Sequence, residues 1–475
     1  MTWVQLEHGL GAALRANRPG SGVPHVVVAL PSLNLGPSLL VHYARRIPAL
    51  EHRFLLGVPM LARVRDAELV LACSVPPPPC EVDHCFSLLP PDARDDCRRR
   101  FRVLSVDDPS SRPLAGKLLD RPDLVERLRG WIGDRPGFIE PWNVTDTEVA
   151  LAEALGIPVN GTAPELWPLG FKSAGRRLLR EAGVPVSDGA EDVRGVDDAL
   201  AAIEAIRSRR PDCRGVVVKT DNSGSGDGNR VIRLGAGQDA REALSHLPDW
   251  YVEDLHHGAV VEELVCGEPF SSPSVQVDLL PDGPPRVVST HEQVLGGSEG
   301  QVYLGCRFPA DEGYAADLAR YGLAAGERLG RRGALGRIGI DFAAGRAPDG
   351  RLRLCALEVN LRKGGTTHPF AVLRNLVPGR YDLAAARWVA DAGGHRFYEA
   401  TDNLLDPAWL GRDPAEVIDS VRGAGLEFDH SRGVGVVLHM LSGLAVEGRM
   451  GLTAIGTSRA HAAGLFAATV EVLRG

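Results

Sequence analysis

Over the first third of the chain, short apolar runs alternate with stretches of helical period. Residues 25–30 form a continuous apolar run that ends before Pro31, which is typical of a strand buried in a parallel sheet. Further strands are expected at 69–75, 101–106 and 157–159, and helices at 37–47, 114–132 and 145–155. This alternation favours a small α/β unit with a parallel sheet over about 25–165.

The pattern changes after residue 170, where strands separated by turn signals outnumber helices. Pro281-Asp282-Gly283 and Pro348-Asp349-Gly350 indicate antiparallel hairpins. This pattern is typical of an α+β fold. The expected strands are 215–220, 230–234, 259–265, 273–280, 285–290, 301–306, 337–343 and 351–359, with helices at 171–182, 196–209 and 311–331. A tail from about 395 is expected to form helices at 413–424 and 458–473 and strands near 433–440 and 451–457.

Composition narrows the class of protein. The 475 residues correspond to about three domains at ~100–200 residues each, and the net charge of −8 offers no basic field for nucleic acid or an anionic membrane. No apolar run approaches the ~20 residues of a membrane span, and residues 1–20 do not read as a signal peptide. The eight cysteines include no Cys-x-x-Cys pair, so we expect reduced thiols in a cytoplasmic protein.

A glycine-rich segment at 222–229 follows the strand that ends near Lys219, and its core is Gly224, Ser225 and Gly226. A strand rather than a helix follows it, so the loop is the tip of a hairpin and a dinucleotide-binding fold loses its support. Such a tip can donate backbone N–H groups to phosphate oxygens, and Lys219 could reach the same phosphates. The alternative is an ordinary surface turn.

Acidic residues mark two strands that a hairpin would bring together. Glu358, Asn360 and Arg362 fall on one face of their strand because side chains alternate, and Asp341 ends the preceding strand. Two carboxylates and an amide oxygen suit Mg²⁺, and Arg362 could neutralise a transferred phosphoryl group. The alternative is a solvated polar face, which explains Asn360 poorly because strands disfavour asparagine.

The segment immediately after these residues is Gly364-Gly365-Thr366-Thr367-His368. Its two glycines let the backbone approach a ligand closely, so their N–H groups could form an oxyanion hole. His368 is a candidate base, and a structural histidine is an equal alternative.

The order of these features along the chain resembles the ATP-grasp superfamily of carboxylate–amine ligases over about 170–390. The features are Lys172 at a helix start, Lys219 before the glycine-rich segment, the segment 261–267 as a hinge, and then Asp341 and Glu358-x-Asn360-x-Arg362. The resemblance implies a Rossmann-like pre-ATP-grasp α/β domain (1–165), a small lobe with the glycine flap (166–260), a large lobe with the metal site (261–394) and a small α+β extension (395–475). It implies that ATP is held by Lys172, Lys219, Gly224, Ser225, Gly226 and the hinge residues Glu262, Glu263 and Val265. The ribose position of the family is Pro269 here, which leaves the neighbouring Glu268 as the candidate. The metal ligands for two Mg²⁺ would be Asp341, Glu358 and Asn360, and the catalytic groups Arg362, Gly364 and Gly365.

The whole chain, including the segments Leu30-Pro-Ser-Leu-Asn34 and Gly435-Val-Val-Leu-His439-Met440, looks most similar to the pheganomycin-type peptide ligases. This resemblance implies activation of a nonproteinogenic, guanidine-bearing amino acid as an acyl phosphate and its coupling to the N-terminal amine of a peptide, with a homodimer by analogy. The expected substrate-binding residues are His291, Glu292, Glu299, Arg307, Arg337, Thr366 and His368. Two alternatives stay open: a ligase joining two small amino acids or an amino acid and a polyamine, and a nucleotide-binding regulatory protein without turnover.

Overall fold

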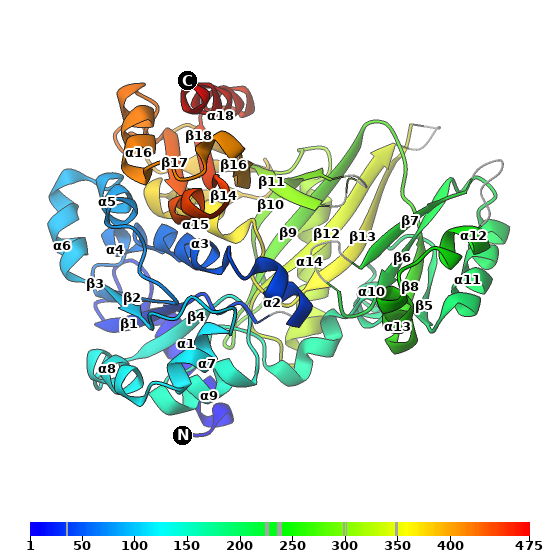
Figure 1. The fold of residues 1–475 in the computed structure, drawn as a ribbon, viewed down its shortest axis with the longest axis horizontal. Coiled ribbons are helices and arrows are strands. Elements are labelled where there is room, and N and C mark those ends of the chain that lie inside the picture. Colours follow the sequence, from blue (N-terminus) through cyan, green and yellow to red (C-terminus); the bar gives the residue numbers. More distant parts are fainter. Residues whose placement is uncertain (35–36, 224–227, 235–239, 298–299, 301, 347–349) are drawn as a thin grey trace.

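The computed structural model describes the chain except residues 35–36, 224–227, 235–239, 298–299, 301 and 347–349. Three sheets organise the described residues: a parallel sheet near the N-terminus, a four-stranded antiparallel sheet, and a ten-stranded sheet between and above them (Figure 1). Within this described part, no helix has the length and apolar character needed to cross a membrane. The mixture of α/β and α+β texture expected from the sequence is confirmed.

The N-terminal sheet is fully parallel, with the strand order β3-β2-β1-β4. All six residues of β1 are buried, as a doubly covered strand requires. The expected helix over 114–132 divides at Pro122, which lacks an N–H and restricts the residue before it. The strands are β1 (His25–Leu30), β2 (Ala67–Cys73), β3 (Phe101–Ser105) and β4 (Gly137–Pro141). The helices are α1 (Trp3–Ala16), α2 (Pro37–Tyr43), α3 (Ile47–His52), α4 (Met60–Arg63), α5 (Pro79–Ser87), α6 (Arg94–Arg99), α7 (Leu114–Leu119), α8 (Pro122–Ile132) and α9 (Asp146–Leu155).

The small lobe projects to one side of the molecule (Figure 1). Its sheet has the order β5-β8-β6-β7, and Lys219 on β6 is paired with Asn229 on β7, so the expected hairpin around the glycine segment is confirmed. The strands are β5 (Gly189–Val193), β6 (Gly215–Thr220), β7 (Asn229–Arg233) and β8 (Ala259–Glu263). The helices are α10 (Lys172–Glu181), α11 (Val196–Arg209), α12 (Ala240–Ser245) and α13 (Asp249–His257).

The large sheet begins with the strand order β13-β12-β9-β10-β11. Valines and isoleucines on one of its faces pack against α14, whereas the other face packs against α15 and the N-terminal unit. The polar residues that concern the site lie on this second face. The strands are β9 (Phe270–Leu279), β10 (Arg286–Gly296), β11 (Val302–Phe308), β12 (Gly336–Arg346) and β13 (Leu352–Asn360), and the helices are α14 (Ala315–Gly330) and α15 (Thr367–Leu376).

The tail adds strands to the same sheet, because β16 pairs with β11 on one side and with β18 on the other. The sheet therefore runs without a break across residue 395. The sequence pattern missed the first three of the tail strands, β14 (Gly379–Asp382), β15 (Arg387–Ala390) and β16 (His395–Leu405). The others are β17 (Gly435–His439) and β18 (Arg449–Gly456), with the helices α16 (Pro414–Gly423), α17 (Leu444–Glu447) and α18 (Arg459–Arg474).

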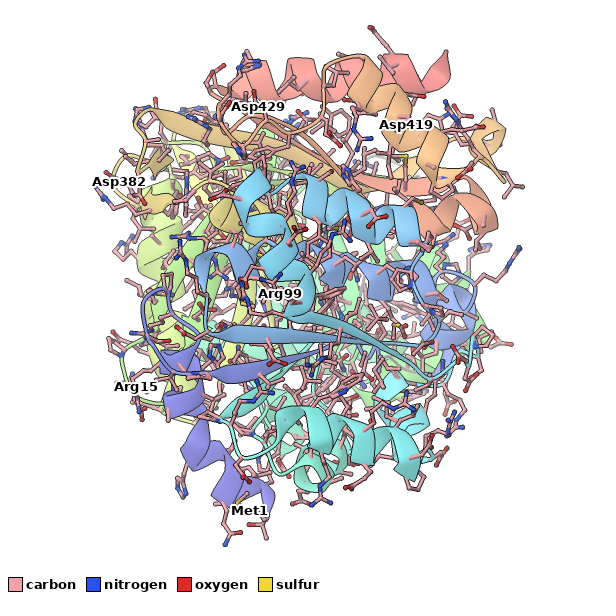
Figure 2. The ribbon with its side chains drawn as sticks, turned by 90° about the vertical axis from the view of Figure 1, so that its left-hand side faces the viewer. Met1, Arg15, Arg99, Asp382, Asp419 and Asp429 are labelled. Carbon is pink, nitrogen blue, oxygen red and sulfur yellow. The ribbon has the colours of Figure 1, made fainter. Side chains whose placement is uncertain are left out.

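Tail and N-terminal unit lie side by side. Figure 2 views the molecule from the left-hand side of Figure 1. There the tail elements that carry Asp419 and Asp429 lie above the elements that carry Arg99 and Arg15. Arg46 of the N-terminal unit forms an ion pair of 2.7 Å with Glu447 of α17, and α5 packs against α16. This arrangement lets segments far apart in the sequence contribute to one site.

Candidate active site

Two neighbouring strands, β12 and β13, bring the predicted acidic residues together. Asp341 of β12 is paired directly with Glu358 of β13. The Asn360 amide donates hydrogen bonds to Asp341 (2.9 Å) and to Glu358 (3.2 Å), and Gln293 of β10 donates one to Asp341 (2.7 Å). The hairpin pairing expected from the sequence is therefore confirmed, and Gln293 is an addition that the sequence pattern did not single out.

The two carboxylates have very different electrostatic surroundings. Burial and the neighbouring charge of Glu358 raise the pKa of Asp341 to about 8. Burial also acts against ionisation of Glu358, but Lys172 and Lys219 outweigh it and hold the pKa of Glu358 well below its usual range. The pair thus carries one well compensated negative charge on Glu358, and the second carboxyl group, Asp341, ionises less readily than an ordinary aspartate.

This donor set fits a hard divalent cation. Two carboxylates and a side-chain amide supply the oxygen ligands that Mg²⁺ prefers, and a cation there would satisfy the carboxylate of Asp341. The clustering of Asp341, Glu358 and Asn360 within hydrogen-bond distance on the wall of a cavity favours a metal site over a solvated polar strand face.

Both predicted phosphate-binding lysines are buried beside these carboxylates. Lys172 is the first residue of α10, and its ammonium lies 2.6 Å from the Glu358 carboxylate. Lys219 extends from β6 and forms an ion pair with Glu262 of β8. Between them the two lysines join the small lobe to the acidic pair on the large sheet.

The hinge residues take different positions. Glu262 is buried and paired with Lys219 and with Arg176 (2.5 Å), whereas Glu263 is held by Arg353 (2.9 Å) and Arg210 (3.2 Å). Val265 packs into a small apolar cluster with Ala343, Cys355 and Leu357, and Glu268 follows it in the loop before β9. Such an apolar cluster beside a buried carboxylate could receive a flat ring with amino groups.

A cavity of about 540 Å³, here called the first cavity, is lined by all the predicted metal ligands and catalytic residues. Its predicted lining residues are Lys219, Asp341, Glu358, Asn360, Arg362, Gly364, Gly365 and Thr366. The N-terminal unit adds Leu33, Tyr43, Arg46, Arg53 and Trp142, and the tail adds Asp402, Asn403, Met440, Glu447 and Arg449. No sequence signal indicated these additions, because they come from segments without a recognisable motif.

The structure does not bring all predicted substrate residues to this cavity. His291 is fully buried and lies 2.6 Å from the Tyr398 hydroxyl. Glu292 and Arg307 lie opposite each other on the α14 side of the sheet, where Glu292 accepts a hydrogen bond from Tyr314 and Arg307 pairs with Glu399. Strand alternation explains the position of Glu292, since the neighbour of a site-facing residue such as Gln293 must point to the opposite face.

The remaining predicted substrate residues have other positions. Arg337 is paired with Asp278 (2.5 Å) and lines a second cavity, which His368 also lines. Gly224, Ser225, Gly226 and Glu299 lie outside the described residues.

His368 belongs to a buried cluster that the sequence did not reveal. The Asp402 carboxylate contacts His368 Nε2 (2.6 Å), His439 Nε2 (2.9 Å) and the guanidinium of Arg53 (2.9 Å). Burial lowers the pKa of His368 to about 4, so this imidazole is neutral near pH 7 and donates to Asp402. The cluster joins β16, α15, β17 and the N-terminal unit directly behind Thr366.

The sequence is similar to proteins that are named as ligases. It is 32% identical over 400 residues to the L-propargylglycine–L-glutamate ligase of Streptantibioticus cattleyicolor, covering 80% of each chain. Residues 416–469 match the family model described as the PGM1 C-terminal domain. The matched residues span β17, α17 and β18, with parts of α16 and α18.

Solved structures share the fold over almost the whole chain. An ADP complex of N5-carboxyaminoimidazole ribonucleotide synthetase matches with a TM-score of 0.55 at 14% identity, covering 95% of this chain and 98% of that one. The biotin carboxylase of Campylobacter jejuni matches with a TM-score of 0.57 at 14% identity, covering 94% and 91%. The sequence relationship, together with this fold, shows that the chain belongs to the ATP-grasp family of ATP-dependent carboxylate–amine ligases.

Proposed function

We propose that this ligase activates an amino-acid carboxylate as an acyl phosphate and couples it to the amine of a second amino acid or a peptide. The observation that carries the proposal is the convergence of Asp341, Glu358 and Asn360 with Lys172 at 2.6 Å from Glu358. This arrangement combines oxygen ligands for a metal with ammonium groups for phosphates. A magnesium ion held by these three residues would neutralise phosphate charge.

In the first step, a carboxylate oxygen of the substrate forms a bond to the γ-phosphorus of ATP, and the bond to the β-phosphate oxygen breaks. ADP leaves with that oxygen. Lys172 and Lys219 would hold the phosphates, and Arg362 would face the charge that develops on the transferred group. Arg362 suits this role because it lines the first cavity, where its guanidinium donates a hydrogen bond to the neighbouring carbonyl of Lys363 (3.0 Å).

In the second step, the amine nitrogen attacks the acyl carbon, the bond to the phosphate oxygen breaks, and phosphate leaves as the amine loses a proton. The negative oxygen of the tetrahedral intermediate needs donors, which the N–H groups of Gly364 and Gly365 would supply. A Cβ at Gly365 would lie 2.5 Å from the Tyr303 ring, so only glycine leaves this backbone accessible next to the cavity.

The observations constrain the identity of the amine substrate less than that of the carboxylate substrate. The named relative joins two free amino acids, which favours an amino acid as acceptor in this chain as well. A peptide acceptor is favoured by the space available, because a second cavity of about 820 Å³ shares Arg53 and Trp142 with the first. We propose the peptide acceptor, with the free amino acid as the second candidate.

A guanidine-bearing donor gains no support from the part of the chain that the structure describes. The carboxylates that line the first cavity away from the metal ligands are Asp402 and Glu447, and both are already paired with arginines. A substrate guanidinium would have to displace these partners. The proposal therefore extends to an amino-acid carboxylate without this side chain.

The test is mass spectrometry of products formed from ATP, Mg²⁺, a panel of amino acids, and acceptors that run from single amino acids to tetrapeptides. We expect ADP, phosphate and an amide product, with a higher kcat/KM for peptides than for single amino acids. Hydroxylamine should trap the acyl phosphate as a hydroxamate when the acceptor is omitted. Release of AMP and pyrophosphate instead would contradict an acyl phosphate, and a preference for single amino acids would select the second candidate.

A further inference from the structure

The second cavity lies between the N-terminal unit and the large sheet, next to the segment Lys363–Thr367, here called the glycine loop. Lys363 and Thr367 line the second cavity, whereas Gly364, Gly365 and Thr366 between them line the first. The Arg53 guanidinium lies 4.3 Å from the centre of the Trp142 ring, and both side chains line both cavities. A ligand in the second cavity would therefore be separated from the metal ligands only by this loop and this stacked pair.

Its lining is strongly basic. Among the described residues, eight basic side chains and two acidic ones line the second cavity: Arg18, Arg53, Arg63, Arg286, Arg337, Lys363, Arg374 and Arg380, with Glu140 and Asp278. The two acids are already neutralised, since Glu140 pairs with Lys363 (2.8 Å) and Asp278 pairs with Arg337 (2.5 Å). A surplus of positive charge remains in an enclosed space, where an anion would be attracted most strongly.

Arg374 of α15 is a basic residue of this lining whose charge is not paired by the described residues. Its guanidinium makes no hydrogen bond or ion pair to the residues that the structure describes, although its backbone carbonyl accepts one from Arg63 (2.6 Å). Burial and the nearby Arg337 and Arg286 lower the pKa of Arg374, and Asp278 and Glu140 compensate them only in part. A partly buried guanidinium among like charges is an incomplete arrangement that a carboxylate fork would complete.

We propose that the second cavity binds the carboxylates of the amine substrate, and that Arg374 is the residue with which one of them pairs. The ligand class is an acidic amino acid or acidic peptide whose amine reaches the glycine loop while its body occupies the basic cavity. This inference rests on the proposed function and adds the charge of the second substrate to it. It also explains why the cavity is far larger than the activated amino acid alone would require.

A binding measurement without ATP tests the site directly. The probes are L-glutamyl-L-glutamate and the neutral L-glutaminyl-L-glutamine, and quenching of tryptophan fluorescence reports them because Trp142 and Trp388 line the cavity. We expect the acidic dipeptide to bind at least about tenfold more tightly than the neutral one, and Arg374→Gln to remove about tenfold of that affinity. Arg374→Lys should keep most of it, and Arg127→Gln on exposed α8 is the matched control. Equal binding of both dipeptides, or an Arg374→Gln variant that binds like the wild type, would overturn the proposal.

Kinetics separate a substrate site from an effector site. In Arg374→Gln, the KM for the acidic acceptor should rise about tenfold while the KM for ATP and for a neutral acceptor stay within twofold. Succinate, which has carboxylates but no amine, should compete with the acidic acceptor, and uncompetitive or non-competitive inhibition would overturn the substrate assignment in favour of an effector. A chain that binds the acidic dipeptide but releases no ADP would refute the proposed function and leave the anion site standing.

Discussion

Two carboxylate centres lie along the first cavity, and they differ in how their charge is compensated. At the acidic pair, Asp341 faces Glu358 and its pKa is raised to about 8 by burial and by that like charge. At the tail, Asp402 is held by Arg53 and by two imidazoles, and despite its burial these partners keep the pKa of Asp402 well below its usual range. In the first centre Glu358 is paired with Lys172, but Asp341 forms no ion pair with the described residues, whereas Asp402 in the second centre is fully paired.

The two centres contain similar residue types, but we interpret the acidic pair as a ligand-binding site and the Asp402 cluster as a structural one. His368, Asp402 and His439 have the residue types of a metal site, and their ligand atoms lie within 4.8 Å of one another. The guanidinium of Arg53 already supplies the positive charge that a metal would bring, and both imidazoles contact the same carboxylate oxygen. Residue types alone would therefore favour a metal at either centre equally.

The largest expected effect is on catalysis at the acidic pair. Glu358→Ala should reduce ADP release at least ~1000-fold, because it removes both a metal ligand and the partner of Lys172. A coupled assay of ADP release with ATP, Mg²⁺ and substrates measures this. The matched control is Glu399→Ala, a strand carboxylate on β16 that pairs with Arg307 away from the cavity. A wild-type rate in Glu358→Ala would remove the basis of the metal assignment.

At the Asp402 centre, the largest effect should be on stability. Asp402→Ala should lower the free energy of unfolding by about 3 kcal/mol, since it leaves the Arg53 guanidinium buried without its partner. Denaturant unfolding measures the loss. The double variant with Arg53→Met should recover part of it, because no unpaired charge remains. If a chelator destabilised the wild type as much as the substitution does, the cluster would be a metal site and the comparison would fail.

The same centre should respond to acid through His368. Its pKa is about 4 in the folded chain, because burial outweighs the favourable contact with Asp402, against about 6.5 when unfolded. The unfolded chain thus binds more protons between these values, so the contribution of His368 is complete above pH 6.5 and is lost as the pH falls toward 4. We expect His368→Gln to reduce the slope of stability against pH in this window by up to about 1.4 kcal/mol per pH unit. Identical slopes in both proteins would contradict a neutral, buried His368.

The two centres also differ in how far the sequence could predict them. Asp341, Glu358 and Asn360 lie on two strands joined by a short turn, so alternation and pairing were enough to predict their convergence. Asp402 lies on β16, whose buried positions include Arg396 and Asp402 themselves, and this strand was missed because its hydrophobic alternation is broken by charges. Those charges are satisfied by residues distant in sequence: the Gly433 carbonyl accepts from Arg396, and Arg53 pairs with Asp402.

The substrate residues show the same limit on a smaller scale. The sequence analysis proposed Glu292 of β10 as a substrate residue, whereas Gln293 is the residue of this strand that faces the first cavity. The face of a strand that a ligand meets depends on which helix covers the other side, and α14 joins this packing from a later segment of the chain. Local patterns predict that a strand exists, whereas the tertiary packing decides which of its two faces is functional.

The smallest predicted effect has the opposite sign and tests the comparison most closely. Asp341→Asn should raise the free energy of unfolding by about 1 kcal/mol in the presence of a chelator, because it removes a carboxyl group whose ionisation is opposed by burial and by Glu358 in the folded chain but is free in the unfolded chain. The exposed Asp317→Asn on α14 is the control, and it should change stability by less than about 0.5 kcal/mol. With saturating ATP and Mg²⁺ the order should reverse, since ligand at about 100 times its Kd stabilises the wild type by about 2.7 kcal/mol and the variant loses this gain. If Asp341→Asn were destabilised in the chelator by as much as Asp402→Ala, the two carboxylates would be compensated alike, and the distinction between an incomplete and a complete centre would not hold.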